Sequence, residues 1–437
     1  MMRAGLSRWS YRLCVAAWPL AALLIIAGCT RNLGDARRTA QPADNRPAQV
    51  YRGPGQAAPT VGQPPAPESA IKAEPLPPPS ATEEQPGEAT LPRNAVRVGI
   101  LLPLSGAEAP VGRALLDAAL LGVADTADDL LELRVYDTAA PGGSRLAAQS
   151  ALADGARLVL GPLLSSDVAE ATPVVRAAGV NLIAFSNNPA VAGPGSYVIG
   201  LSPRQQVRRI VAFARERGLE RFAALVPESP FGQQAADDLR QAAAASGGTV
   251  VRVESYATTE QNDVASAIRH LVRGEGDPRF DAVLLPESGT RLRAVAPLLP
   301  YYGIDPAKVR LLGIASWSDP GLGREPALVG GWFAAPPPDA AADFAKRMTA
   351  IYGAAPHPLA GLAYDAAALA AVLARGEHGA DFSAEALTQP RGFAGSSGIF
   401  RLLPAGETQR GLAVLEVTQA GPRVIAPAPE SFDDLGQ

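Results

Sequence analysis

The feature that most constrains the fold is an alternation of short apolar runs and amphipathic stretches that begins at residue 95. Val96–Leu102 is a mainly apolar run, and Gly112–Ala124 after it has the pattern of a helix. The alternation restarts at Phe222–Val226, after Gly218 has ended a helix. Strands that alternate with helices build parallel sheets covered by helices on both faces. The sequence therefore predicts an α/β protein of two lobes, each with a mainly parallel sheet flanked by helices.

The clearest helical period follows Pro203. Four apolar residues recur there at the spacing of one helix face, and arginines occupy the other faces. The apolar residues are Val207, Ile210, Val211 and Ala214. This stretch is predicted to be an amphipathic helix with one face in a core.

The end of the chain has a different pattern. Ile399–Leu403 and Leu412–Thr418 are predicted to be antiparallel strands joined by glycine turns. We therefore expect one folded domain at about 95–430. Its lobe boundaries are placed as follows: the first lobe at about 95–217 and 335–395, and the second at about 218–334 together with the C-terminal tail.

The N-terminus has the pattern of a signal peptide. Three arginines precede the apolar stretch Leu13–Ile26, which as a helix spans only roughly 21 Å of a bilayer core of about 30 Å. The tetrapeptide Ile26–Cys29 resembles a bacterial lipobox, which implies cleavage after residue 28 and a lipid on Cys29. Thr30 stands where an aspartate retains lipoproteins of this kind in the inner membrane. We therefore expect the protein to be anchored to the periplasmic face of the outer membrane. An anchor helix with an incidental cysteine, or inner-membrane retention, is the alternative.

Residues 29–94 are expected to be a disordered tether. The stretch Gln41–Pro92 contains 13 prolines and few large apolar residues, so it cannot bury enough surface to offset the entropy of ordering. It provides reach, or acts as a passive spacer. Loss of residues 1–28, which hold three arginines and no acid, moves the formal charge from −4 to −7. This acidic balance argues against a nucleic-acid partner.

Several ordered motifs carry a resemblance to a known family. Val98–Gly106, with the sequence VGILLPLSG, resembles the opening strand and loop of type I periplasmic binding proteins of the leucine-binding class. Leu160–Ser166 resembles the third strand and loop of that class, and Pro227–Gly232 and Ala363–Ala366 also fit it. The resemblance covers nearly all of residues 95–425. It implies two lobes with a ligand cleft between them.

Within that class the lipobox, the tether and the ending SGIFRLLPAGETQRGLAVLEV are most similar to penicillin-binding protein activators of the LpoA type. Those proteins are outer-membrane lipoproteins that stimulate a class A penicillin-binding protein, which is a peptidoglycan synthase. The resemblance therefore implies a non-catalytic activator with such a synthase as its partner. The helical-repeat domain of larger members is replaced here by the tether. The alternative is a substrate-binding receptor of an ABC transporter for amino acids or another small ligand.

The resemblance also implies which residues line the cleft. Ser165 matches a family serine, Asn187 stands where a threonine binds the ligand carboxylate, and Phe231 stands where a tyrosine closes the cleft. The acid that binds an ammonium group is missing after Gly313, and Glu287 is its possible substitute. The complete set of candidates is Ser105, Ser165, Ser166, Phe185, Asn187, Phe231, Glu287, Ser316 and Trp317.

Each of these candidates has a structural alternative. Ser105 and Ser165 follow strands and precede helices, where serine caps backbone N–H groups. Asn187 can shape a turn. Trp317 is either a partner anchor or a half-buried packing residue, and Glu287 is either a cleft acid or a solvated loop acid.

No catalytic site is expected. His270, His357 and His378 are the only histidines, and none has a second ligand one helical turn away or a neighbouring nucleophile motif. The two cysteines, Cys14 and Cys29, lie in or at the edge of the signal peptide, so the mature domain has no thiol chemistry. We expect no enzyme activity, no cofactor and no metal.

Overall fold

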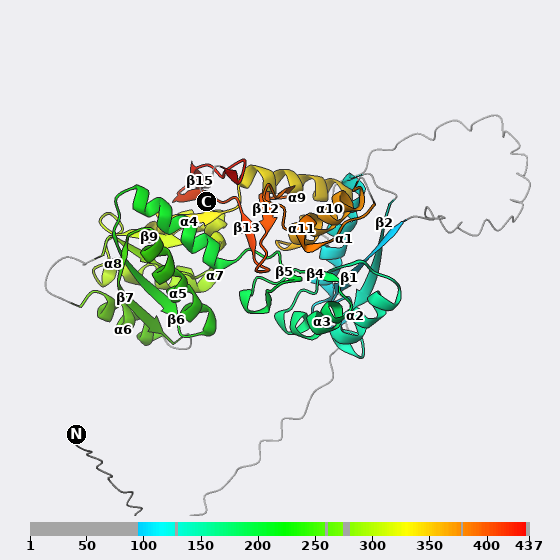
Figure 1. The fold of residues 1–437 in the computed structure, drawn as a ribbon. Coiled ribbons are helices and arrows are strands. Elements are labelled where there is room, and N and C mark those ends of the chain that lie inside the picture. The colour runs from blue at the N-terminus through cyan, green and yellow to red at the C-terminus, as the bar shows by residue number, and fades with distance from the viewer. Residues whose placement is uncertain (1–94, 127–129, 258–260, 274–279, 377–378, 434–437) are drawn as a thin grey trace, which may run out of the picture. The chain divides into compact units, whose positions relative to one another are not determined.

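The computed structural model describes residues 95–126, 130–257, 261–273, 280–376 and 379–433. The predicted signal peptide (1–28), lipid attachment at Cys29 and tether (29–94) lie outside the described residues. Two helix-covered sheets and a smaller third sheet make up the described part (Figure 1). The predicted α/β fold class is confirmed.

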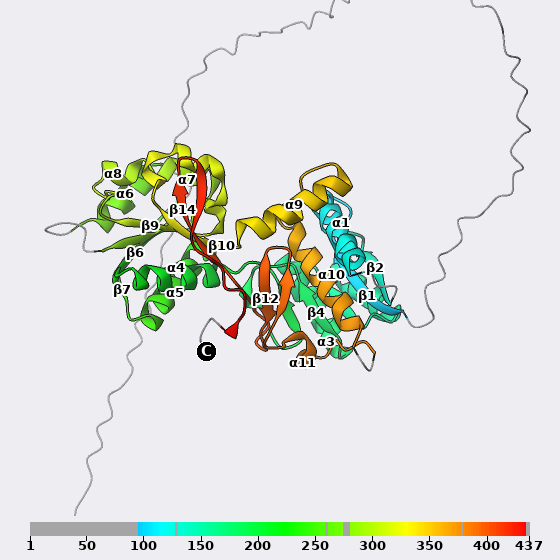
Figure 2. The ribbon, with the colours of Figure 1, turned by 90° about the horizontal axis from the view of Figure 1, so that it is seen from above.

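The first lobe is built on a five-stranded parallel sheet in the order β2-β1-β3-β4-β5. Its strands are β1 (Val96–Leu102), β2 (Leu131–Asp137), β3 (Leu158–Leu160), β4 (Asn181–Ala184) and β5 (Ser196–Val198). Its helices are α1 (Ala109–Asp125), α2 (Gly143–Ala153), α3 (Ser165–Ala177), η1 (Pro189–Val191), α9 (Pro338–Tyr352), α10 (Ala360–Ala374) and α11 (Ala384–Leu387). Figure 2 shows α1 and α10 side by side. They pack closely because Gly122 of α1 faces the backbone of Tyr364.

The second lobe is built on a seven-stranded sheet in the order β15-β14-β10-β9-β8-β6-β7. Its strands are β6 (Arg221–Pro227), β7 (Thr249–Tyr256), β8 (Ala282–Leu284), β9 (Arg310–Gly313), β10 (Trp332–Ala335), β14 (Ala413–Thr418) and β15 (Gly421–Ala426). The first five are parallel, and β14 and β15 add an antiparallel edge. Its helices are α4 (Pro203–Glu216), α5 (Pro230–Ala245), α6 (Gln261–Leu271), α7 (Gly289–Val295), α8 (Leu298–Tyr301), η2 (Ala315–Ser318), η3 (Pro320–Arg324) and η4 (Pro326–Leu328).

The predicted lobe boundaries need two corrections. The apolar face of α4 packs with β6 and β10 in the second core, so the second lobe begins near residue 203 and not at 218. The tail also divides between the lobes. The small sheet of β11 (Phe393–Gly395), β12 (Gly398–Leu402) and β13 (Thr408–Arg410) packs on the first core through Phe400 and Leu402, whereas β14 and β15 complete the second sheet.

The helix predicted after Pro203 is confirmed in register as well as in existence. Val207, Ile210, Val211 and Ala214 are all fully buried.

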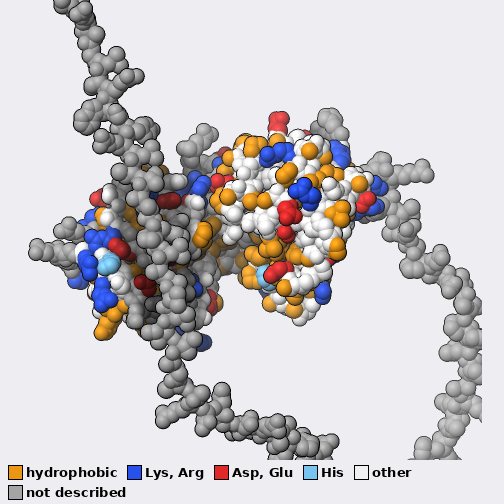
Figure 3. Space-filling model, turned by 90° about the horizontal axis from the view of Figure 1, so that it is seen from below, with side chains coloured by type: hydrophobic (Ala, Val, Ile, Leu, Met, Phe, Trp, Pro, Cys, Tyr) orange, Lys and Arg blue, Asp and Glu red, His pale blue; other side chains and the backbone are white. Residues whose placement is uncertain are grey.

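On the face shown in Figure 3, acidic and basic side chains of the first lobe are interspersed with hydrophobic and neutral ones. In the part of the chain that the structure describes, no helix is both long and apolar enough to cross a bilayer.

Candidate functional site

Four described segments cross between the lobes and fix the geometry of their junction: 199–202 after β5, 336–337 after β10, 411–412 after β13, and 427–431 after β15, which brings Phe432 onto Arg401 of the first lobe. Polar side chains of α4 bind the 199–202 segment, the end of β13 and the start of η2. Gln206 Nε2 donates to the carbonyl of Ser202 at 3.2 Å. Gln205 Oε1 accepts a hydrogen bond from the backbone N–H of Arg410 at 3.0 Å. Gln206 Oε1 accepts one from the backbone N–H of Ala315 at 2.6 Å. The junction is therefore a set of buried polar contacts and not a bare hinge.

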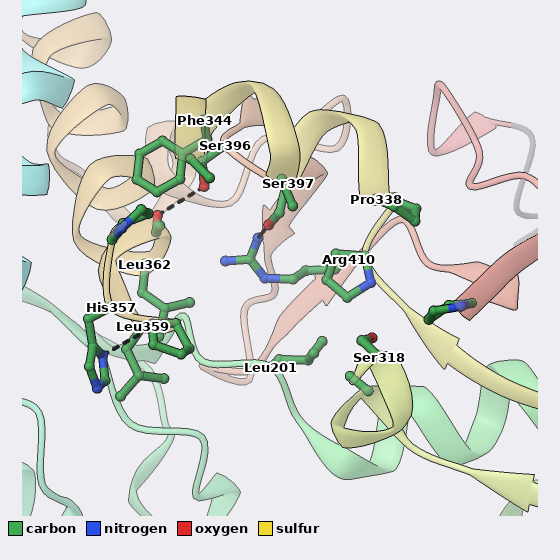
Figure 4. Close-up of a pocket in the computed structure, with 18 of the residues that line it drawn as sticks. Leu201, Ser318, Pro338, Phe344, His357, Leu359, Leu362, Ser396, Ser397 and Arg410 are labelled. Atoms are coloured by element: carbon green, nitrogen blue, oxygen red, sulfur yellow. Dashed lines mark hydrogen bonds between the residues drawn. The ribbon is translucent and has the colours of Figure 1, made fainter. Parts of the chain in front are cut away.

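A cavity of about 690 Å³ opens at this junction, and we call it the hinge cavity (Figure 4). Its walls come from the crossing segments 199–202 and 336–337, from the end of β13, from α9, from the loop before α10 and from the segment after β9. The lining residues are Leu201, Ala315, Ser318, Pro320, Pro336, Pro338, Ala341, Phe344, Ala345, Pro356, His357, Pro358, Leu359, Gly361, Leu362, Ser396, Ser397, Arg410, Leu415 and Pro422. Its volume lies in the range of small-molecule sites.

The guanidinium of Arg410 lies among these lining residues (Figure 4). Its side chain is 3% exposed and forms an ion pair with Asp365 of α10, with 3.0 Å between Nη1 and Oδ2. Nη2 donates to the carbonyl of Ile199 at 3.1 Å, and Nη1 lies 3.4 Å from Ser397 Oγ. The group also stacks on Phe400, with 5.2 Å from Cζ to the ring centroid. Its Nε is buried without a hydrogen-bond partner among the described residues.

A second cavity of about 630 Å³ lies on Arg204, and we call it the Arg204 pocket. It is lined by Asn187, Asn188, Pro189, Ala190, Ser202, Pro203, Arg204, Pro230, Phe231, Gln234, Asp238 and Glu407. Arg204 donates to Asp238 at 3.0 Å and to Glu407 at 3.1 Å. The hydrogen bond to Asp238, together with the charge of Glu407, raises the pKa of Arg204. Since Glu407 follows β12 of the small sheet and Asp238 lies on α5, Arg204 links the two lobes.

A smaller depression of about 350 Å³ lies on the second lobe alone, where β6, β8 and β9 end, and we call it the lobe-2 depression. It is lined by Pro227, Ser229, Phe231, Pro286, Glu287, Ser288, Arg291, Ile314 and Ser316. The Glu287 carboxylate accepts a hydrogen bond from the Tyr256 hydroxyl, and the Glu287 carbonyl accepts one from Ser316 Oγ at 3.1 Å. Burial raises the pKa of Tyr256, and the bond to Glu287 raises it further.

The structure brings some of the predicted cleft residues together. Phe231, Glu287 and Ser316 line the lobe-2 depression, and Asn187 and Phe231 both line the Arg204 pocket. Glu287 is 7% exposed, so it is a buried acid and not a solvated one.

The predicted serines of the first lobe line none of these three sites. Ser166 is exposed and Ser165 is half-buried at the start of α3. Ser105 follows β1 and hydrogen-bonds Asp137. Partial burial alone raises the pKa of Asp137, but the bonds from Ser105 and from backbone N–H groups outweigh it and lower that pKa. The capping role expected as the alternative is not seen either: Glu108 is the N-cap of α1 and Leu164 the N-cap of α3, and neither helix has a side-chain cap bond.

Two predicted cleft residues are corrected. Trp317 is 0% exposed and packs in the second core against Phe333, and its indole N–H donates to the Glu287 carbonyl at 3.2 Å. Phe185 is 2% exposed and packs in the first core. Their large apolar side chains are held inside the lobes by core packing, so neither lines a cleft in this structure.

The charged residues of the junction were missed by the sequence analysis. Arg410 and Asp365 both lie within the motifs that carry the family resemblance, yet no role was assigned to them. A basic residue between two apolar strand segments was the available signal for Arg410. Nothing in the local sequence of Arg204, Asp238 or Glu407 indicates that these three side chains meet. Within the described ranges, no group of three or more His, Cys, Asp or Glu residues is placed to hold a metal ion.

Comparison with known proteins agrees with the fold. A family model described as periplasmic binding protein matches residues 95–422. A solved structure of a putative branched-chain amino acid ABC transporter protein from Rhodospirillum rubrum is 22% identical, with a TM-score of 0.65, and the match covers 76% of this chain and 100% of that one. A solute-binding protein of an R. palustris ABC transporter in complex with benzoate is 20% identical, with a TM-score of 0.52, and the match covers 77% of this chain and 97% of that one.

Curated relatives match over shorter stretches. An uncharacterized protein of Rickettsia prowazekii (strain Madrid E) is 23% identical over 224 residues, which cover 50% of this chain and 60% of that protein. The penicillin-binding protein activator LpoA of Enterobacter sp. (strain 638) is 28% identical over 139 residues, which cover 32% of this chain and 19% of that protein. In both cases the chain spans less than two thirds of the relative's length.

Proposed function

Because the chain belongs to the periplasmic binding protein family, whose members bind ligands and do not transform them, we propose that it is a solute receptor that binds a small molecule where its two lobes meet. The observation that carries the proposal is the position of the hinge cavity. It is lined by both lobes and by two of the segments that join them, so a ligand bound there contacts both lobes at the point about which they would rotate.

The solved relatives support this choice of function. Their matches extend over almost the whole of each solute-binding protein, and one of them is in complex with a small aromatic acid. The match to the LpoA activator covers only 19% of that protein. A receptor is therefore a better account than the activator that the terminal motifs favoured.

The N-terminal motif adds a location to the proposal. Cys29 closes the lipobox-like tetrapeptide, so the receptor is held at a membrane surface by lipid on this residue and works in the periplasm. Metabolic labelling with a fatty acid tests this part. Label on the wild-type chain and none on a Cys29→Ser variant is expected, and equal labelling of both contradicts it.

Activation of a class A penicillin-binding protein is the second candidate function. It is favoured by the partial similarity to LpoA and by the predicted tether, which gives the domain reach from a membrane toward the cell wall. A rate increase in a glycan-polymerisation assay of a class A synthase with the full chain supports it. If that increase occurs without any small ligand, activation of the synthase replaces solute binding as the proposed function.

Thermal unfolding of the full chain against a panel of amino acids, organic acids and sugars tests the receptor function. A ligand at ~100 times its dissociation constant adds about 2.7 kcal/mol to the free energy of unfolding. A concentration-dependent rise of the unfolding midpoint with one chemical class is expected. The variant Tyr301→Ala is the control, because Tyr301 is 78% exposed and lines none of the three sites, so it keeps the same response.

A further inference from the structure

Arg410 has hydrogen-bonding capacity that the protein does not use. A guanidinium has five N–H donors. Asp365 and Ile199 accept from its terminal nitrogens, Ser397 lies at a marginal 3.4 Å, and Nε has no partner among the described residues although the side chain is 3% exposed. A buried donor without an acceptor is costly, since it has lost water and gained nothing. Because Arg410 is one of the residues that line the hinge cavity, an anionic acceptor that enters the cavity is placed next to this positive charge.

The rest of the cavity is mainly apolar. Leu201, Leu359, Leu362, Phe344 and several prolines line it, and the remaining polar side chains are those of His357 and three serines. Such walls favour the burial of a hydrocarbon body, because apolar surface is removed from water without loss of hydrogen bonds. The walls and Arg410 together fit a molecule that is apolar at one end and a hydrogen-bond acceptor at the other.

The charges of the lining residues narrow the class further. None of the described residues that line the cavity is Asp or Glu, and Asp365 is already paired with Arg410 and is not itself a lining residue. An ammonium group placed in the cavity would be buried without a carboxylate partner, which is strongly unfavourable. In contrast, the Arg204 pocket is lined by Asp238 and Glu407, and the lobe-2 depression by Glu287.

We propose that the hinge cavity binds a carboxylic acid that has an apolar body and lacks an ammonium group, with its carboxylate on Arg410. This inference rests on the proposed receptor function and names the ligand class. The receptor therefore selects against free amino acids, although amino-acid binding proteins share its fold.

Matched ligands test the class. Leucine differs from 4-methylpentanoate only by its ammonium group, phenylalanine differs in the same way from 3-phenylpropanoate, and 4-methylpentanamide lacks the carboxylate. Isothermal titration of the full chain with these five compounds is expected to show binding of the two acids. The amino acids and the amide are expected to bind at least tenfold more weakly.

A cavity-filling variant tests the position. Ala345 lines the hinge cavity from α9, whereas Ala342 is exposed on the same helix and does not line it. Ala345→Trp is expected to weaken acid binding at least tenfold, and Ala342→Trp is expected to leave it unchanged. The role of Arg410 is tested in the double variant Arg410→Met with Asp365→Asn, which leaves no buried unpaired charge and is expected to lose the preference for acid over amide.

The possible results separate this inference from the receptor function. Tighter binding of leucine or phenylalanine than of the matched acids overturns the inference and leaves the receptor function in place. Acid binding that persists unchanged in Ala345→Trp also overturns it. Absence of binding by these compounds and by every class in the thermal panel removes the receptor function itself.

Discussion

The buried pair of Arg410 and Asp365 gives the sharpest stability prediction. Their side chains are 3% and 0% exposed, and besides the ion pair Asp365 Oδ1 accepts a hydrogen bond from the Ser396 N–H at 2.5 Å. Loss of one partner leaves the other charge buried and unpaired, which typically costs about 3–5 kcal/mol. Arg410→Met and Asp365→Asn are each expected to lower the free energy of unfolding by about that amount.

The double variant Arg410→Met with Asp365→Asn is expected to cost about as much as one single variant, because no charge remains unpaired and the amide oxygen introduced by Asp365→Asn can still accept from the Ser396 N–H. The expected coupling energy is then about 3 kcal/mol. The exposed pair Arg240–Asp237, with side chains 53% and 59% exposed, is the matched control. Its coupling energy is expected to be below about 1 kcal/mol.

Urea unfolding followed by far-ultraviolet circular dichroism at pH 7 measures these energies for the wild type and the six variants. A cost of Arg410→Met below about 1 kcal/mol would show that the pair is not a buried ion pair. So would a coupling energy for the buried pair no larger than that for the exposed pair. Either result would mean that water reaches the ion pair, and that the cavity around Arg410 is not the apolar site described above.

Three further predictions concern single positions in the fold. Ser229 Oγ caps α5 by accepting a hydrogen bond from the Gly232 N–H at 3.1 Å. Ser229→Ala is therefore expected to lower the free energy of unfolding in urea by about 1 kcal/mol. Ser288 stands at the start of α7 but makes no cap bond, so Ser288→Ala is expected to cost close to nothing. Gly161 has φ +82°, and an added Cβ would lie 2.2 Å from the Leu101 carbonyl oxygen, so Gly161→Ala is expected to lower the free energy of unfolding by at least about 2 kcal/mol. Gly179 has φ +69° but open space around it, so Gly179→Ala is expected to cost only about 1 kcal/mol. Partial burial alone raises the pKa of Asp281, but the hydrogen bonds from Arg221 and from two backbone N–H groups outweigh burial and lower that pKa. The carboxylate therefore stabilises the fold above its unfolded pKa of about 3.9, and this stabilisation is lost as the pH falls through the lower pKa of the folded state. Asp281→Asn is therefore expected to cost about 1–3 kcal/mol at pH 7, and a pH series of unfolding midpoints should show the difference closing in acid; a difference independent of pH would contradict this assignment.

The sequence predicts local structure in this protein well, because the apolar period of each element survives in the fold. The face of α4 named from its spacing is the buried face. The prediction that α4 belongs to the first lobe was wrong, because amphipathicity shows that a helix packs against a core but not on which sheet. The same limit explains Trp317, whose position after a strand suggested a cleft, although its burial depends on contacts with Phe333 and the Glu287 carbonyl that only the folded chain provides.

The candidate site was harder to predict, because its polar groups are distant in the sequence. Arg410 pairs with Asp365, 45 residues away, and with the Ile199 carbonyl, 211 residues away. Family motifs pointed instead to the serines after β1 and β3, which lie outside the three sites. The resemblance thus located the fold and the lobe-2 cluster of Phe231, Glu287 and Ser316, whereas the buried arginine at the junction required the structure.

We propose above that a small molecule binds at the lobe junction. The most direct test of this proposal is a structure of the full chain determined after incubation with the compound that gives the largest rise in unfolding midpoint. The compound is expected to lie in the hinge cavity, in contact with α9 and within hydrogen-bonding distance of Arg410. A compound found elsewhere on the protein, with the hinge cavity closed by side chains, would contradict it.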